Sequence, residues 1–505
     1  MDIYFLNQFL FPIFIFLILV SILGYGALVN NYILEDNKYL HLKNIIFIKG
    51  LIFVGIINIF INLYFPISNL ISIIIIIIGI ILYFFFFLKF NNKKKELFFI
   101  LFVLLLSFFY SFYAGFNDDY NYHYETIKNF KNKNLFEILH HRNISYNSHW
   151  LFLISIFSIS TFTSTLFVIS SLLYSISIYD FFNLTKSSIK NQKYYLSIIC
   201  FFCLLFFLGV LNQMKDLGTD VPGVIVCIYI FLIIFYNIFE KQKTHNNNFF
   251  FTIFLFCQFA FVIKISNILI FLFLFFLLFK IKINTTNLLY IFGICLIPIP
   301  WLFQNVIISG CLIWPISLTC FANTDLAIHE TYLIESFAKG DMATKMKINN
   351  FSWIYIWFVN HSSKIIETYL IYLFLLFSPF IYLVISKKYK FILIKNSLKE
   401  KYFNFNYFII LSIIMICNLI WFFYAPAYRF GIFYNLSFII ISLIPIWLFM
   451  IKYDSKFIYS YSKFILIFIC LYFVYENISR IDWYLKRYDS WPPIYEEKLL
   501  ERKNF

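Results

Sequence analysis

Residues 66–90 read PISNLISIIIIIIGIILYFFFFLKF, and no charged residue occurs in this stretch before Lys89. A helix needs about 20 consecutive apolar residues to span the hydrocarbon core of a bilayer, so this stretch is long enough to cross a membrane. Similar apolar runs lie at about 9–29, 44–64, 97–114, 150–179, 194–211, 221–238, 249–263, 267–280, 287–303, 366–386, 406–424, 430–450 and 461–479. The sequence therefore predicts an all-α fold, a polytopic transmembrane bundle of about 12–14 spans.

The composition of the whole chain supports this prediction. Of 505 residues, 62% are hydrophobic and 13% are charged, whereas soluble domains have about 45–50% apolar and about 25% charged residues. The net charge of +15 could suggest a nucleic-acid partner, but the basic residues form short clusters between apolar runs. A soluble enzyme and a nucleic-acid-binding module are therefore excluded, and membrane lipids are the expected surroundings.

The positions of lysine and arginine predict the orientation of the spans, because cytoplasmic loops carry an excess of these residues. One set of alternate loops contains 21 basic residues, and the opposite set contains 10, or 16 with the C-terminal tail. The first set is predicted to be cytoplasmic, which places both termini outside. No basic residue precedes the first run, so it does not read as a cleavable signal peptide.

Two short runs of about 15 residues flank Lys264. The alternation of charge favours a hairpin of short or re-entrant helices at 249–280 over one long span. Among nine cysteines, only Cys311 and Cys320 fall in an expected external loop, where they could form a disulfide.

Two external loops, 115–149 and 304–351, are long enough to carry chemistry. Ten of the 25 acidic residues fall in three external segments, in 118–137, 216–220 and 325–341. For the last segment we favour an ordinary polar loop. Phosphate-binding glycine loops and zinc-protease motifs are absent from the sequence, which argues against ATP-driven and zincin chemistry.

The first acidic segment begins where the 97–114 run ends. Asp118 and Asp119 are adjacent there, and a helix that restarts after them would place Tyr120, His123 and Ile127 on one face. Carboxylates at a bilayer surface, with an imidazole nearby, suit a general base or a divalent-cation ligand. Further histidines follow up to residue 149, but their spacing matches no common zinc site, so an interfacial or sugar-facing lining is favoured.

The second segment is the polar turn 212–222. Its charged side chains could bind an anion and a hydroxyl; they are Lys215, Asp216 and Asp220. Alternatively, Thr219 or Asp220 caps the next helix, with Pro222 in its first turn.

Two basic residues stand apart on the predicted outer side. Arg429 lies in the turn between two spans, bordered by Tyr424 and Tyr428, and Lys264 lies at the break between short runs. A guanidinium can hold a phosphate bidentately. The alternative is an anchor to lipid head groups.

Five short motifs occur in order along the chain: Asp118-Asp-Tyr-Asn-Tyr-His123, Tyr146-Asn-Ser-His-Trp150, Lys215-Asp-Leu-Gly-Thr-Asp-Val-Pro222, Pro300-Trp-Leu-Phe-Gln-Asn305 and Ala425-Pro-Ala-Tyr-Arg-Phe-Gly431. With these motifs the chain resembles a bacterial family of multi-spanning proteins related to the GT-C glycosyltransferases. The similarity covers roughly 97–450. Residues 1–96 would then be accessory spans, and 451–505 would be a last span with an external tail.

The resemblance implies a GT-C-like transferase in the bacterial cytoplasmic membrane with its active face outward. The donor would be a sugar on a polyprenyl phosphate, and the acceptor an envelope glycan or lipid. By this resemblance Asp118 or Asp119, with Asp119 preferred, removes the acceptor proton as the anomeric centre inverts, and His123 lies nearby. Lys215, Lys264 or Arg429 would stabilise the leaving phosphate. Mg²⁺ or Mn²⁺ could take part.

Two other functions stay open. A polysaccharide polymerase or ligase shares large outer loops but would usually carry several arginines there, whereas the outer loops hold only Arg142 and Arg429. A flippase or transporter of lipid-linked sugars needs ionisable residues deep in the spans, and Lys49, Lys264, Lys364 and Glu367 come near that depth.

Overall fold

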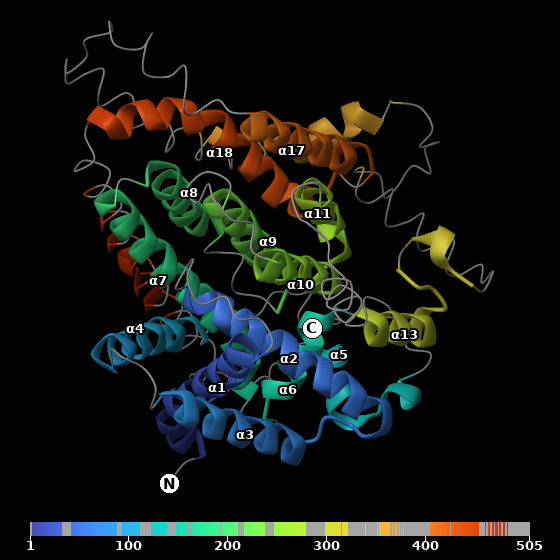
Figure 1. The fold of residues 1–505 in the computed structure, drawn as a ribbon. Helices are drawn as coiled ribbons and strands as arrows, with labels where there is room; N and C mark the ends of the chain where they lie inside the picture. The colour runs from blue at the N-terminus through green and yellow to red at the C-terminus, as the bar shows by residue number, and fades with distance from the viewer. Residues whose placement is uncertain are drawn as a thin grey trace, which may run out of the picture.

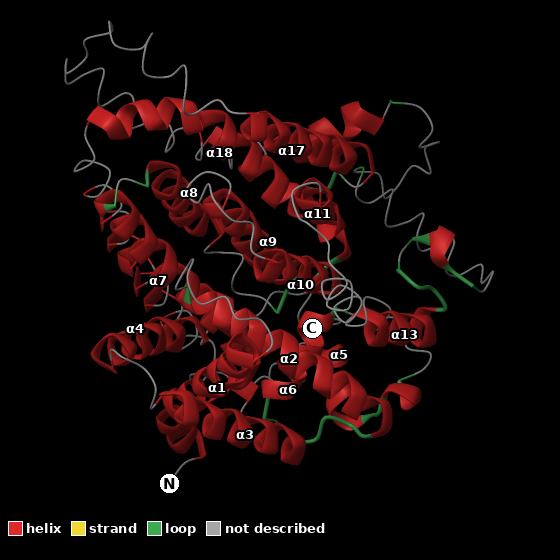
Figure 2. Ribbon diagram, viewed as in Figure 1, coloured by secondary structure: helices red, strands yellow, loops and turns green. Residues whose placement is uncertain are grey.

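The protein is all-helical throughout the residues that its computed structural model describes (Figures 1 and 2). The described residues are 3–32, 42–87, 93–111, 123–138, 148–159, 163–191, 193–210, 217–237, 247–278, 298–314, 316–321, 339, 351, 353–363, 405–424, 426–453 and isolated positions in 366–377 and 460–482. The α-helices are α1 (Ile3–Tyr32), α2 (Lys43–Tyr64), α3 (Asn69–Phe87), α4 (Lys93–Ser111), α5 (Tyr124–Asn132), α6 (His149–Phe157), α7 (Val168–Lys190), α8 (Tyr194–Val210), α9 (Asp220–Phe235), α10 (Asn247–Ile263), α11 (Phe271–Leu278), α13 (Pro298–Ser309), α17 (Phe405–Tyr424) and α18 (Tyr428–Tyr453). The 3₁₀ helices are η2 (Leu135–Glu137), η4 (Thr163–Phe167), η7 (Ile265–Ile270) and η8 (Ser317–Thr319).

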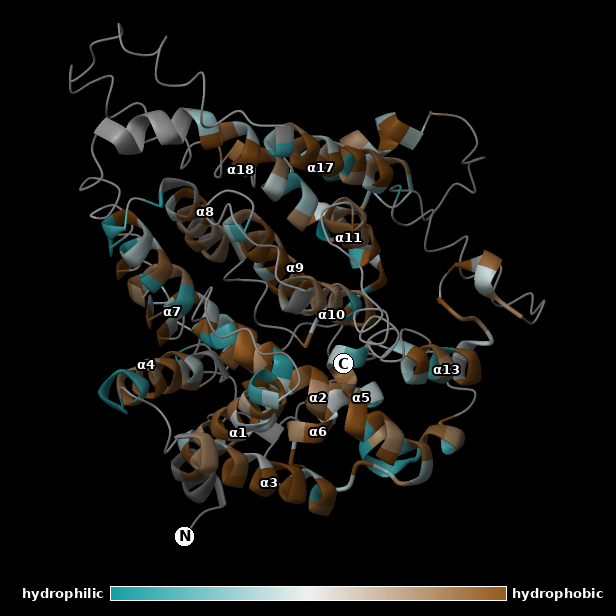
Figure 3. Ribbon diagram, viewed as in Figure 1, coloured by the Kyte–Doolittle hydropathy of each residue, from teal (hydrophilic) through white to brown (hydrophobic). Residues whose placement is uncertain are grey.

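Six helices are long and apolar enough to cross a membrane. These candidate spans, within the described residues, are Leu10–Tyr32, Lys43–Tyr64, Asn69–Phe86, Thr165–Lys190, Asn406–Tyr424 and Tyr428–Pro445. Figure 3 shows apolar residues along most of their length, whereas hydrophilic residues gather at the start of α4, which is not one of the six. The protein is therefore a multi-pass integral membrane protein, as its apolar runs predict.

One continuous apolar core joins the helices. Helix α1 packs against α2 and α3, α4 packs against α7, and α7 also packs against α8. Helix α9 lies against α10, and α18 contacts α17, α8 and α9 (Figure 1). Helices α17 and α18 thus lie along one side of the bundle, at the top of Figure 1.

Glycine allows a close helix contact between α1 and α3. A methyl group added to Gly24 would overlap the carbonyl oxygen of Gly79, and one added to Gly79 would overlap Ser21. In a membrane, small residues at helix contacts replace the hydrophobic effect as the source of association, because they let backbones approach closely.

Contacts between helix ends agree with the predicted alternation of loops. Lys43, at the start of α2, pairs with Glu96, at the start of α4, and both positions are predicted to be cytoplasmic. At the opposite end, the N–H of Ile67 donates to the carbonyl of Phe130 over 2.9 Å. Ile67 lies at the beginning of the predicted run 66–90, at its predicted external end, and Phe130 lies in the predicted external loop 115–149.

The predicted run 150–179 is wrong as a single helix. Helix α6 ends at Phe157, and α7 begins at Val168 after a turn of 3₁₀ helix. Serine and threonine hydroxyls supply the alternative hydrogen bonds at the break, because the Ser158 hydroxyl bonds the carbonyl of Ser155 over 3.1 Å and the N–H of Ile159 donates to Thr165 Oγ1 over 3.0 Å. A count of apolar residues cannot predict that side-chain hydroxyls replace helical hydrogen bonds at this point.

The second long loop also begins later than expected. The sequence predicts it from residue 304, whereas α13 continues to Ser309 and Gly310 then adopts a φ of 73°. Gln304 and Asn305 stay inside the helix, where both are buried. Glycine tolerates this left-handed conformation without the clash of a Cβ, so the helix ends there.

Candidate functional site

Lys264 lies at a break between two short helices. Helix α10 ends at Ile263, Lys264 is extended with φ −154° and ψ 124°, and η7 follows. The side chain of Asn267 donates to the carbonyl of Ala260 over 3.0 Å, which ties the two sides of the break together. Phe271 of α11 then packs edge-on against Phe261 of α10. The chain therefore turns back at Lys264, as the sequence predicts.

The Lys264 ammonium forms an ion pair with Asp220, the first residue of α9. Both side chains are largely buried, with 13% of Lys264 and 29% of Asp220 exposed. Thr219 occupies the N-cap position considered for it, and its carbonyl accepts the N–H of Gly223 over 3.2 Å, but its side chain makes no capping bond. The Asp220 carboxylate lies at the positive end of the α9 dipole and beside a cation, which is a favourable place for a negative charge.

A second cation, Arg429, lies near this ion pair, because Lys264 and Arg429 both contact the ring of Phe430. Lys264 Nζ lies 4.4 Å from the centroid of the Phe430 ring, and Arg429 Cζ lies 5.3 Å from the same centroid. Both distances are within the range of cation–π attraction. Arg429 is exposed and, among the described residues, has no carboxylate partner. Asp220, Lys264, Phe430 and Arg429 are named the outer cation site below.

The end of the first long loop reaches the same break. The hydroxyl of Ser148 donates to the carbonyl of Ile263 over 2.7 Å and accepts the N–H of Trp150, which caps α6. His149 follows, buried against Gly55 of α2 and Phe259 of α10. Burial lowers the pKa of His149 to about 3, so the imidazole is neutral at physiological pH.

Three of the predicted substrate-binding residues therefore come together: Asp220, Lys264 and Arg429. His123 lies at the start of α5, where His123 and Ile127 are both buried. Tyr120 of the predicted face lies outside the described residues. The same is true of Asp118, Asp119, Lys215 and Asp216, so their roles stay predictions.

The described residues hold no group of three or more histidine, cysteine or acidic side chains that could bind a metal ion. Asp220, the single carboxylate of the outer cation site, is already paired with Lys264. A divalent cation therefore does not fit this site, and no step is assigned to one.

A buried carboxylate that the sequence patterns do not single out is Asp180 of α7. It accepts the N–H groups of Lys43 and Asn44, over 3.1 and 2.8 Å, and the hydroxyl of Tyr229, over 3.2 Å. Asp180 thus caps the start of α2 from another helix. Its one sequence signal is that it is a lone acid directly after an apolar stretch.

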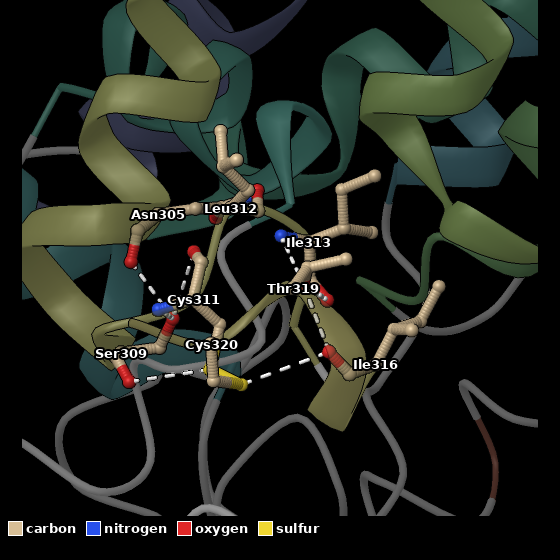
Figure 4. The surroundings of a disulfide bond; sticks show 8 residues. All are labelled: Asn305, Ser309, Cys311, Leu312, Ile313, Ile316, Thr319 and Cys320. Carbon is tan, nitrogen blue, oxygen red and sulfur yellow. Dashed lines mark hydrogen bonds between the residues drawn. A yellow bond between two sulfur atoms is a disulfide. The ribbon is translucent and has the colours of Figure 1, made fainter. Parts of the chain in front are cut away.

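Cys311 and Cys320 form a disulfide, which confirms the pairing that the sequence allows. Figure 4 shows the short hairpin that it closes, in which the N–H of Ile313 donates to Thr319 Oγ1 over 3.0 Å and Asn305 of α13 bonds the carbonyl of Leu312. Disulfides persist in oxidising compartments, so this bond agrees with an external position for the second long loop.

Lys131 of α5 supplies a pH-dependent contribution to stability. Its ammonium donates to Asn69 and Ser72 at the start of α3, and burial lowers its pKa from 10.5 to about 8. The folded state therefore releases this proton at lower pH than the unfolded chain, so the penalty for burying the charge is complete below pH 8 and disappears towards pH 10.5.

We expect the thermal stability of the purified protein to rise between pH 8 and 10.5, as measured by loss of monodisperse protein on heating. The variant Lys131→Met should lack this part of the rise. Equal pH profiles for the variant and the wild type would contradict the assignment.

A protein family described as "Domain of unknown function (DUF8201)" matches residues 9–436. The match covers most of the chain, and the protein therefore belongs to this family. Neither a curated protein nor a solved structure matches the chain.

Proposed function

We propose that this member of a family of unknown function is a membrane glycosyltransferase. It takes a sugar from a polyprenyl-phosphate donor and transfers it, with inversion, to an envelope glycan or lipid on the outer face. The observation that carries the proposal is the convergence of Asp220, Lys264 and Arg429 around Phe430. Each of the three comes from a different turn, and all three turns are predicted to be external.

The chemistry of this site suits the phosphate of a lipid carrier. One carboxylate and two cations leave a net positive charge, and Arg429 lies exposed in the first turn of α18. Helix N-termini carry partial positive charge, so a cation there lowers helix stability but strengthens an anion site. Arg429 would hold the phosphate bidentately, while Asp220 holds Lys264 in place.

The proposed reaction uses two groups of residues, one for the acceptor and one for the leaving phosphate. The acceptor hydroxyl approaches the anomeric carbon from the side of Asp118 and Asp119, and one of these carboxylates removes its proton. The bond between the anomeric carbon and the phosphate oxygen breaks as the new bond forms, and Arg429 meets the charge that develops on the leaving phosphate. The products are a glycosylated acceptor and polyprenyl phosphate.

Binding by Arg429 variants tests the anion site. In nanodiscs with a fluorescent polyprenyl phosphate, Arg429→Gln should weaken binding about 10- to 100-fold, because a charge-assisted hydrogen bond contributes about 1.5–3 kcal/mol. Arg429→Lys keeps the charge but loses the planar fork, so its loss should be smaller. An uncharged polyprenol should bind equally to all three proteins. Unchanged phosphate binding by Arg429→Gln would overturn the assignment.

A lipid-linked-sugar flippase is the second candidate, and one observation favours it. Lys49 of α2 is completely buried within a candidate span, and its ammonium donates to Asn30 of α1 over 2.9 Å. Buried ionisable residues at that depth often mark transport pathways. Vesicles with a labelled polyprenyl-phosphate sugar separate the two functions, because a flippase moves the intact lipid across the bilayer without releasing polyprenyl phosphate.

A further inference from the structure

The turn that carries Arg429 is held by two tryptophans from different segments. Trp357 Nε1 donates to the carbonyl of Pro426 over 2.7 Å, and Trp421 Nε1 donates to the carbonyl of Ala427 over 3.0 Å. Trp357 lies in the helical segment 353–363, whereas Trp421 lies in the last turn of α17. Both indoles are nearly buried, so these hydrogen bonds are shielded from water.

The two carbonyls are those that precede α18. Ala427 accepts the N–H of Phe430 over 2.9 Å, which makes it the residue from which the first turn of α18 begins. The Trp421 ring also packs on the backbone of Gly431, where any Cβ would overlap it. Trp421 therefore contacts this turn on both sides of Arg429 and Phe430.

The tryptophans also reach Phe430 itself. Trp353, Trp357 and Trp421 form a buried cluster, and Phe430 packs against it. Through the Phe430 ring the cluster is thus connected to Lys264, and through the 353–363 helix it is connected to the end of the second long loop.

We infer that Trp357 and Trp421 are positioning residues that hold Arg429 and Phe430 in place in the outer cation site. This inference rests on the proposed function in one respect, namely that Arg429 binds the phosphate of the donor. The hydrogen bonds to Pro426 and Ala427 fix the start of α18, and the guanidinium can then meet a phosphate without first ordering the turn.

The variant Trp357→Phe tests the inference, because it keeps an aromatic ring and removes the N–H. We expect the affinity for fluorescent polyprenyl phosphate in nanodiscs to fall about three- to tenfold, as for a lost hydrogen bond. Amide hydrogen exchange at 427–431 should become faster. The matched control is Trp353→Phe, one helical turn earlier in the same cluster, whose indole makes no hydrogen bond among the described residues. It should change neither quantity by more than about twofold.

A double variant separates positioning from general destabilisation. If Trp357 acts through Arg429, adding Trp357→Phe to Arg429→Gln should cause no further loss of binding. Additive losses, or equal effects of Trp357→Phe and Trp353→Phe on exchange at 427–431, would overturn the inference. If the wild type binds no polyprenyl phosphate, the proposed function fails, while the exchange measurement still decides whether the two indoles hold the turn.

Discussion

Asp119→Asn is expected to reduce sugar transfer about 10²- to 10⁴-fold, because general-base assistance contributes a factor of that size. The amide cannot accept the proton of the acceptor hydroxyl, although it fills nearly the same space. Asp118→Asn should cause the smaller loss of the two, since Asp119 lies nearer the Tyr/His-rich continuation of the segment. Binding of the donor should change little in either variant.

The measurement is analysis of glycan and lipid-linked sugar in cells that carry each variant. Glu125→Gln is a suitable control, because Glu125 is an acid in the first turn of α5, only a few residues further along. Its product should match that of the wild type. Wild-type product from both Asp118→Asn and Asp119→Asn would end the assignment of the base to this segment.

Asp180→Ala is expected to destabilise the protein by about 2–5 kcal/mol. The substitution leaves two backbone N–H groups and the Tyr229 hydroxyl without their acceptor inside the bundle, and a buried unsatisfied donor costs about 1–3 kcal/mol. Part of this cost is offset because the carboxylate no longer has to be buried. The start of α2 should fray as a result.

Size-exclusion chromatography after heating in detergent measures this effect as a lower apparent melting temperature. Asn183→Ala is the matched control, three residues along the same helix, where the side chain is exposed and donates to the carbonyl of Tyr179 in its own helix. It should behave like the wild type. If Asp180→Ala and Asn183→Ala have the same apparent melting temperature, the capping role of Asp180 is wrong.

Long apolar runs predicted the membrane-spanning helices well, because the cost of placing charge in hydrocarbon leaves a strong mark on composition. The break at Lys264 was also predictable, since a charge between two runs too short to span a membrane is typical of a helical hairpin. Alternation of loops placed Asp220, Lys264 and Arg429 on one side. It could not show that they share the ring of Phe430, because a contact between residues so far apart in sequence depends on how the helices pack.

Other features left too weak a signal in the sequence. Asp180 and Asn44 are separated by 136 residues, and nothing near either residue indicates the other. The interruption of 150–179 depends on hydroxyl groups of serine and threonine, which are nearly neutral in a count of apolar residues. Trp357 and Trp421 could equally have been lipid-facing aromatics, since their role lies in which carbonyls their N–H groups reach.

The most direct test of the proposed function is a transfer assay with the purified protein in vesicles. A radiolabelled polyprenyl-phosphate sugar is supplied with an envelope extract as acceptor, and labelled glycan and free polyprenyl phosphate are measured together. We predict that both products accumulate with the wild type and fall at least tenfold with Arg429→Gln, in line with the loss of a charge-assisted hydrogen bond. Movement of the intact lipid across the bilayer, without either product, would contradict the proposed transfer.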